Sequence, residues 1–123
     1  MAFLSDTVLD AALNVLDTAT STLHICSQEP TTFAEATSTY TLGNKTSLDI
    51  GSPADRTGGG REVTVAAFTD GNVTGNGTAT HYAIVDGSTL LATNNLSASQ
   101  AVTSGNTFGL GAFQIGIPDA VSA

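Results

Sequence analysis

The sequence predicts a mainly β protein, an antiparallel β-sandwich or small jelly roll with a short N-terminal helix or arm. Strand-like runs rich in Val, Ile, Thr and aromatic residues recur after residue 60, about every 8 to 12 residues, with turn signals between them. Only 11% of the residues are charged, and Thr, Ser, Asn and Gly supply most of the polarity, which suits β-structure. A hydrophobic fraction of 41% argues against disorder.

The C-terminal half carries the clearest strand patterns. The runs REVTVAAF (61–68), TATHYAIV (78–85) and STLLAT (88–93) are predicted strands. Between the last two, the dipeptide Asp86-Gly87 favours a tight type I′ hairpin turn. The other predicted breaks in this half are the turn pair Asp70-Gly71, a polar link at 97–100, the turn Gly105-Asn106 and the terminating Pro118.

The N-terminal part combines a predicted helix with a predicted strand. Residues 5–17 carry an apolar stripe at helical spacing, and Ser5 or Asp6 can cap the start of the helix. A strand over residues 12–17 is the competing interpretation. The run TSTLHICSQ (20–28) alternates as a strand does.

A short helical turn is predicted after this strand. Thr32 and Glu35 have the spacing of a capping box, in which each side chain bonds the backbone N–H of the other residue. Phe33 and Tyr40 are expected to pack beneath the turn.

Two further breaks are predicted before residue 61. Gly43-Asn44 is expected to form a turn, and GSPADRTGGG (51–60) a flexible surface loop, because its three successive glycines bring no side chain to a core. A glycine-rich phosphate cradle would need the spacing of a nucleotide-binding loop and a helix after it. The spacing is missing, and the pattern that follows is a strand.

The totals of the chain exclude several function classes. Its 123 residues suit one domain, 1–123. The single cysteine, Cys26, excludes an internal disulfide framework and a Cys-based zinc site. A net charge of −8 with only three basic residues leaves no electrostatic footprint for nucleic acid and would be repelled by an anionic membrane surface.

No segment predicts a membrane span or a secretory signal. Apolar runs fall short of the roughly 20 residues of a span, and MAFLSDTVLD has no basic region followed by an apolar stretch. We therefore expect a protein made in a cytoplasm and used there or in a larger assembly.

No catalytic spacing connects the residues that could carry chemistry. His24 and His81 belong to no HxH or HExxH pattern, and no GxSxG elbow is present. On the strand at 79–85, His81 is expected to share a face with Ala79 and other small apolar residues, with Tyr82 and Ile84 on the opposite face. We expect His81 to be structural, Cys26 to be a buried inert thiol, and the protein to be no enzyme and to use no cofactor or metal.

Three segments resemble those of small structural proteins encoded by tailed bacteriophages and prophages: LSDTVLDAALNVLDT, ICSQEPTTFAEATSTYTLGNKT and GTATHYAIVDGSTLLATNNLSASQAVTSGNTFGLGAFQIGIPD. The resemblance covers nearly the whole chain except the loop at 51–60. It implies a non-enzymatic virion component that is assembled in the host bacterial cytoplasm. Its implied partners are the major capsid protein or other virion subunits.

A capsid decoration (cement) protein is the favoured role. Fibre proteins typically have a heptad stalk or a collagen-like Gly period, together with a second domain. The chain shows none of these features. A tail, fibre or baseplate component is the first alternative. We expect a homo-oligomer, either a trimer or a ring, since most oligomers have closed symmetry. Such an assembly would bury more of the weakly charged surface.

The N-terminal segment, residues 1–18, is the candidate docking arm or helix. The alternative is that it covers one end of the domain's own sandwich. The candidate interface residues are Phe3, Leu4, Val8, Leu9 and Leu13.

A receptor-binding or carbohydrate-binding module is the remaining alternative. Such modules present exposed aromatic rings, and this chain has no Trp, two Tyr and five Phe. Tyr40 and Tyr82 are the candidate stacking residues.

Overall fold

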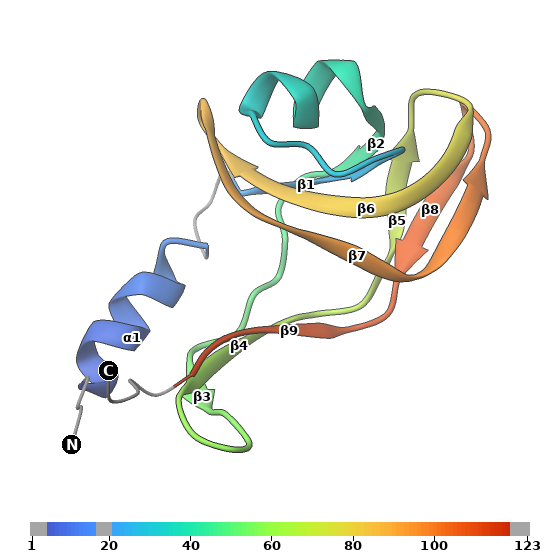
Figure 1. The fold of residues 1–123 in the computed structure, drawn as a ribbon. Helices are drawn as coiled ribbons and strands as arrows, with labels where there is room; N and C mark the ends of the chain where they lie inside the picture. Colours follow the sequence, from blue (N-terminus) through green and yellow to red (C-terminus); the bar gives the residue numbers. More distant parts are fainter. Residues whose placement is uncertain (1–4, 17–20, 119–123) are drawn as a thin grey trace.

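The computed structural model describes residues 5–16 and 21–118, which form a mainly β protein with one short α-helix (Figure 1). The predicted fold class and the predicted N-terminal helix are confirmed. The elements, in chain order, are α1 (Asp6–Asn14), β1 (Thr22–Cys26), the π-helical turn η1 (Glu35–Thr39), β2 (Thr41–Lys45), β3 (Ala54–Asp55), β4 (Arg61–Val65), β5 (Phe68–Val73), β6 (Gly77–Asp86), β7 (Thr89–Val102), β8 (Thr107–Leu110) and β9 (Phe113–Ile117).

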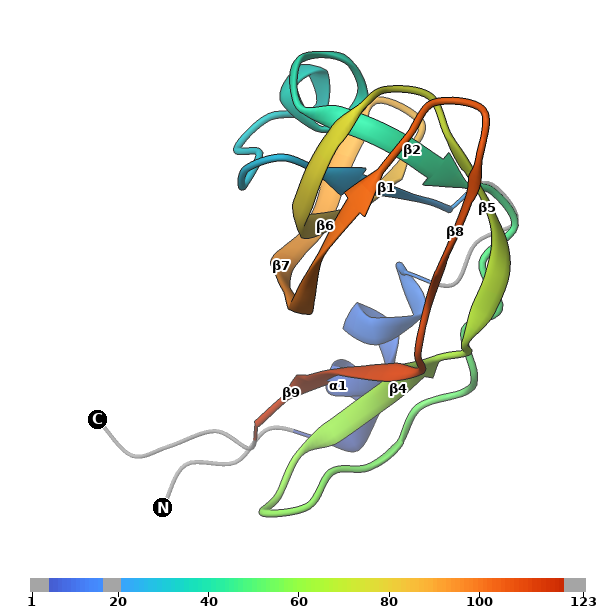
Figure 2. The ribbon, with the colours of Figure 1, turned by 90° about the vertical axis from the view of Figure 1, so that its right-hand side faces the viewer.

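The strands form two antiparallel sheets. The larger has the order β7-β6-β1-β2-β5-β8 and curls into a half-barrel, so that its edge strands β7 and β8 turn toward each other (Figures 1 and 2). The smaller has the order β3-β4-β9 and lies beside α1. Short links at residues 66–67 and 111–112 join the two sheets. Because these links are short, the small sheet is held close to the half-barrel.

The main core lies between the curled sheet, the small sheet and α1. A second, smaller cluster lies on the outer face of the curled sheet, where η1 covers Cys26, Ala83 and Val85. Phe33 and Tyr40 pack against this second cluster, as predicted. The buried residues of the main core are Leu13, Leu16, Leu23, Ile25, Leu42, Leu48, Ile50, Val63, Val65, Val73, Ala79, Tyr82, Ile84 and Phe108.

The helix α1 begins where its cap was predicted. The Ser5 Oγ accepts a hydrogen bond from the backbone N–H of Thr7 at 3.2 Å, which satisfies one of the free donors of the first turn. Leu9 and Leu13 lie four residues apart on one face of the helix and are buried. The competing strand over residues 12–17 is wrong for residues 12–16, which are helix and turn.

Only half of the predicted capping box forms before η1. The backbone N–H of Glu35 donates to the Thr32 Oγ1 at 3.1 Å. The Glu35 carboxylate instead accepts from the backbone N–H and the hydroxyl of Thr31, each at 2.8 Å. These bonds stabilise the charged form, so they lower the pKa of Glu35.

Two predicted turns are strands instead. Gly43 and Asn44 lie within β2, and Asp70-Gly71 lies within β5. A side chain at Gly43 would collide with the Asn72 carbonyl oxygen, and one at Gly71 would collide with the ring of Phe108. The two glycines therefore serve close strand packing over Phe108, and the turn predictions were wrong.

The β6–β7 hairpin is longer than predicted, and its turn lies one residue further along the chain. Asp86 pairs with Thr89, so Gly87 and Ser88 are the central turn residues and Asp86 ends the strand. Gly87 has a positive φ of 60°, and Ser88 does not. A type I′ turn needs a positive φ at both central residues, so the turn fits type II′ and not the predicted type I′. The predicted polar link at 97–100 is also wrong, because these residues continue β7.

Strand β7 has 14 residues against 10 in β6, and two bulges absorb the difference. Leu91 is an extra residue in the ladder, and residues 96–99 face Thr80 alone. Bulges bend a strand and increase its twist. They therefore account for the curvature of β7 around the half-barrel (Figure 1).

The predicted faces of β6 hold except near the second bulge. Tyr82 and Ile84 point into the main core, as expected. Ala79 joins them there, although strict alternation placed it with His81. Pairing with β7 shifts between Ala79 and His81, so the alternation is lost at this point.

Residues 51–60 form an exposed connection that contains the two-residue strand β3. Ala54 and Asp55 pair with Glu62 and Arg61 of β4. The glycines at 58–60 all have positive φ angles, a backbone conformation that glycine adopts without steric cost.

Candidate functional site

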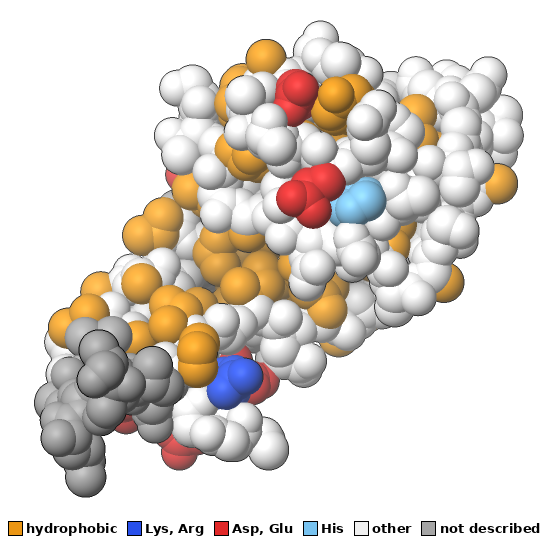
Figure 3. Space-filling view, in the orientation of Figure 1, with side chains coloured by type: hydrophobic (Ala, Val, Ile, Leu, Met, Phe, Trp, Pro, Cys, Tyr) orange, Lys and Arg blue, Asp and Glu red, His pale blue; other side chains and the backbone are white. Residues whose placement is uncertain are grey.

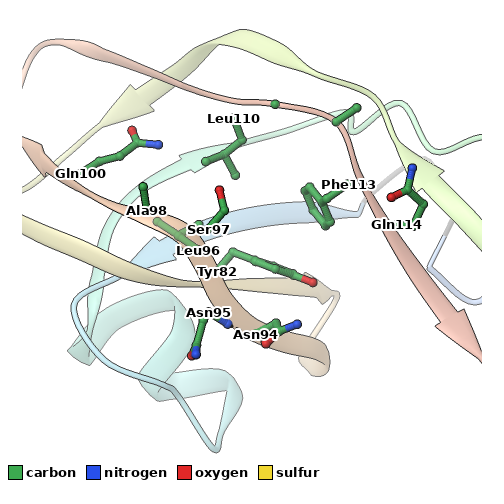
Figure 4. Close-up of a pocket in the computed structure, with 12 residues that line it drawn as sticks. Tyr82, Asn94, Asn95, Leu96, Ser97, Ala98, Gln100, Leu110, Phe113 and Gln114 are labelled. Carbon is green, nitrogen blue, oxygen red and sulfur yellow. Dashed lines mark hydrogen bonds between the residues drawn. The ribbon is translucent and has the colours of Figure 1, made fainter.

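A pocket lies at the seam where the half-barrel does not close. Its volume is about 330 Å³, near the lower end of the roughly 300–1,000 Å³ of small-molecule sites. Residues 94–98 and Gln100 of β7 form one wall, residues 110–114 form the other, and Tyr82 of β6 lies between them (Figure 4). None of the described residues that line the pocket is charged.

The apolar side of the pocket is built around two aromatic rings. The Tyr82 and Phe113 ring centroids are 4.7 Å apart at an interplanar angle of 43°, a tilted contact typical of stabilising aromatic pairs. Leu96 and Leu110 are half-buried and extend this side of the pocket. Burial raises the pKa of Tyr82, so its hydroxyl is held in the protonated form that donates a hydrogen bond.

The polar side of the pocket comes from the second bulge of β7. Residues 96–98, within that bulge, line the pocket. The Ser97 side chain extends from β7 toward Leu110 in Figure 4. Asn94 pairs directly with Tyr82 and therefore shares its face of the sheet. Its Oδ1 accepts from the backbone N–H of Asn95 at 2.8 Å, which leaves the amide NH₂ without a bond to the described residues.

One side chain bridges the seam at the end of the pocket. Gln100 of β7 donates from Nε2 to the Gly109 carbonyl of β8 at 3.2 Å. The wall residues beyond this bridge, such as Asn94 and Phe113, belong to strands that are not paired with each other. The seam is therefore held at the bridge, and the pocket lies beyond it.

The two histidines and the cysteine lie elsewhere, on the outer face of the curled sheet. His24 is buried, and its Nδ1 lies 2.9 Å from the Thr41 Oγ1. Burial lowers the pKa of His24, because it disfavours the charged imidazolium. Cys26 is fully buried, and burial raises the pKa of its thiol to about 11. Both side chains have the properties of packed structural residues.

His81 is half-exposed beside a carboxylate. Its Nδ1 lies 2.8 Å from the Thr80 Oγ1, and its Nε2 lies 3.9 Å from the Glu29 Oε2. Figure 3 shows a histidine and a carboxylate side by side on this face. Residues 5–16 and 21–118 contain no group of three or more His, Cys, Asp or Glu side chains placed to hold a metal ion.

The three cationic side chains are all engaged within the chain. Lys45 pairs with Asp70 at 3.2 Å, and Arg56 donates to the Gly59 carbonyl at 2.9 Å. Arg61 makes the most extensive set of contacts, because it binds Asp10 of α1 at 2.8 Å and Asp55 of β3 at 2.7 Å. Asp10 contributes most to raising the pKa of Arg61, and the ion pair joins α1 to the small sheet.

The structure divides the predicted interface residues. Leu9 and Leu13 are 1% and 2% exposed and pack within the chain's own fold, against the small sheet. Val8 is 51% exposed. Phe3 and Leu4 lie outside the described residues. The buried pair matches the alternative that the helix covers its own domain, whereas Val8 points outward.

The structure separates the apolar residues of the N-terminal helix into a buried face and a second, exposed face. Val8 and Val15 are 51% and 53% exposed, and Ala11 and Ala12 between them are exposed as well. The spacing of three, four and seven residues puts all four on one side of a helix. We name Val8, Ala11, Ala12 and Val15 the outer stripe. Figure 3 shows hydrophobic side chains exposed along α1.

The two candidate stacking tyrosines lie on opposite faces of the curled sheet. Tyr82 lines the pocket, and Tyr40 packs against the outer cluster. Sequence reasoning missed the other pocket residues, because residues 94–98, Gln100 and 110–114 are brought together by the curl of the large sheet and by the small sheet packed beside it. No helix among the described residues is long and apolar enough to cross a membrane.

Comparison of the chain with known protein families, curated proteins and solved structures finds no match.

Proposed function

We propose that the protein is a non-enzymatic structural component of a bacteriophage particle, and specifically a capsid decoration protein that binds the outside of the head shell. The resemblance of three long segments to small phage structural proteins supports the particle role. The outer stripe of α1 supports a docking role, and it is the observation that carries the proposal.

A surface helix normally has one apolar face directed to the core and a polar face directed to water. In α1, Leu9 and Leu13 form the buried face, whereas the outer stripe leaves Val8 and Val15 about half exposed. A helix that is apolar on both sides is suited to burial on both sides. The occupant proposed for the outer stripe is a subunit of the capsid shell.

The charge distribution supports contact through neutral surfaces. All three cations are engaged inside the chain through Lys45, Arg56 and Arg61. Strand β7 contains no charged residue and no proline. Bulges protect this edge from strand pairing instead, and its uncharged surface suits contact with neighbours in an assembly. Many small neutral contacts can supply the area that a stable interface needs.

The docking role is tested with paired variants of α1. Val8→Ser with Val15→Ser removes the two valines of the outer stripe, and Thr7→Ser with Asn14→Ser is the matched control at exposed polar positions. The expected result is that the first pair binds undecorated particles at least tenfold more weakly, while the control binds normally. Both pairs should keep the melting temperature of the parent protein within a few degrees. Unchanged binding by the first pair would show that the stripe is not the docking face.

Copy number separates the head role from the tail alternative. Quantitative protein staining of purified particles should find hundreds of copies, as an icosahedral shell requires. A dozen copies or fewer would place the protein on the tail or baseplate and would contradict the decoration role.

A further inference from the structure

We propose that the pocket at the seam binds a neutral saccharide of one or two sugar units through Tyr82, Phe113 and the bulge of β7. The site goes beyond the assembly role and does not depend on it, because no residue of α1 lines the pocket.

The absence of charge in the lining selects the ligand class. The pocket offers hydroxyl, amide and backbone groups beside two aromatic rings, and no described lining residue is ionised near neutral pH. The whole chain carries a net charge of −8, which disfavours anions. A neutral polyhydroxylated ligand can exchange hydrogen bonds with such groups and place an apolar C–H face against the half-buried Phe113 ring, while the Tyr82 ring lies in the core.

The polar groups in the pocket are free to bind a ligand. The Tyr82 hydroxyl has no hydrogen-bond partner among the described residues. Every fully buried polar side-chain atom in this part of the chain does have a partner. The Tyr82 hydroxyl is therefore not fully buried and can reach solvent in the pocket. Ser97 is exposed and extends toward Leu110 from the opposite wall (Figure 4). The Asn94 amide NH₂ lies on the same face as Tyr82. Donors and acceptors therefore surround the aromatic pair.

The shape of the seam disfavours an extended peptide as the occupant. A peptide that added a strand to β7 would need a regular edge, but residues 96–99 are bulged out of register. The bond from Gln100 to the Gly109 carbonyl also holds the edges together at one end. A volume of about 330 Å³ suits a compact ligand.

The test uses the isotope-labelled full chain and two-dimensional NMR. The probes are glucose, galactose, mannose, N-acetylglucosamine and their disaccharides, with glucuronic acid as the anionic counterpart. At least one neutral sugar should shift the signals of Tyr82, Phe113 and residues 94–98 in a saturable way, and glucuronic acid should bind more weakly. If no neutral sugar shifts these signals at concentrations of tens of millimolar, the proposal is overturned. Shifts produced only by a neutral tetrapeptide such as Ser-Thr-Ser-Gly would overturn it as well.

Matched variants localise the binding. Tyr82→Phe and Ser97→Ala each remove one hydroxyl from the pocket, and each should weaken sugar binding about fivefold. Tyr40→Phe and Ser99→Ala are the controls, because Tyr40 lies on the outer face and Ser99 is in the bulge but not in the lining. The controls should bind as the parent does. Equal losses in test and control variants would show that the sugar does not occupy the pocket.

Discussion

Gln100 and Gly109 are joined across the open side of the half-barrel by a hydrogen bond of 3.2 Å from the Gln100 Nε2 to the Gly109 carbonyl oxygen. The two residues belong to β7 and β8, the opposite edges of the same sheet. A single side chain thus bridges two strands that a closed barrel would pair through the backbone.

Removal of this bridge should loosen the seam without unfolding the protein. Gln100→Ala is expected to lower the free energy of unfolding by about 1 kcal/mol, since one part-buried hydrogen bond is lost. Hydrogen exchange should also speed up in β8 and in the end of β7 near Val102. Ser99→Ala, an exposed neighbour, is the control. Unchanged exchange in Gln100→Ala would mean that the bond does not hold the seam.

The attachment of α1 should depend on the shape of the Arg61 side chain and not only on its charge. Its Nε and Nη2 donate to the two oxygens of Asp10 at 2.8 and 3.3 Å, and its Nη1 donates to Asp55 at 2.7 Å. A lysine cannot reproduce this fork. We expect Arg61→Lys to lower the urea midpoint of unfolding and to speed exchange in α1.

Complete loss of a surface ion pair provides the comparison. Lys45 pairs with Asp70, whose side chain is 71% exposed, and such pairs contribute little. Lys45→Gln should therefore shift the midpoint less than Arg61→Lys does. The opposite order would contradict a locking role for Arg61.

Acid should destabilise the protein through His24. Burial lowers the pKa of His24 in the folded state below its usual value of 6.5. Between these two pKa values the unfolded chain holds a proton that the folded protein does not, so unfolding takes up a proton and stability falls as the pH drops below 6.5. His24→Gln removes this contribution.

The comparison is made between about pH 7 and about pH 5, above the usual Glu35 pKa of 4.5. Urea unfolding of the parent protein should lose more free energy over this range than the unfolding of His24→Gln does. Parallel pH profiles would mean that His24 takes up its proton equally in the folded and unfolded states.

Cys26 should report unfolding through its thiol. It is fully buried, and burial raises its pKa to about 11, so little reactive thiolate is present near neutral pH. We expect the native protein to react with a disulfide reagent at least a hundredfold more slowly than the protein in guanidinium does. Because Cys26 is the single cysteine, the signal is unambiguous, and fast labelling of the native state would disprove its tight packing under η1.

Local sequence rules determined much of this protein. The alternation of apolar and polar residues predicted β1, β4 and β6, and the cap at Ser5 with its apolar stripe predicted α1. These elements follow from contacts between residues close in the chain, and such contacts can be read from spacing alone. The small fraction of charged residues is read directly from the composition, and the lack of catalytic motifs is read from the spacing of residues along the chain.

Only the tertiary structure decided the seam, the pocket and the outward face of α1. Gly43 and Gly71 looked like turn residues, yet both lie in paired strands. Glycine is needed there because the Asn72 carbonyl oxygen and the Phe108 ring, respectively, occupy the space where a side chain would be. Tyr82 of β6 and Phe113 of β9 meet because the two sheets pack against the same core. Such contacts depend on how strands far apart in the chain pack against one another, and the period of a single strand does not contain that information.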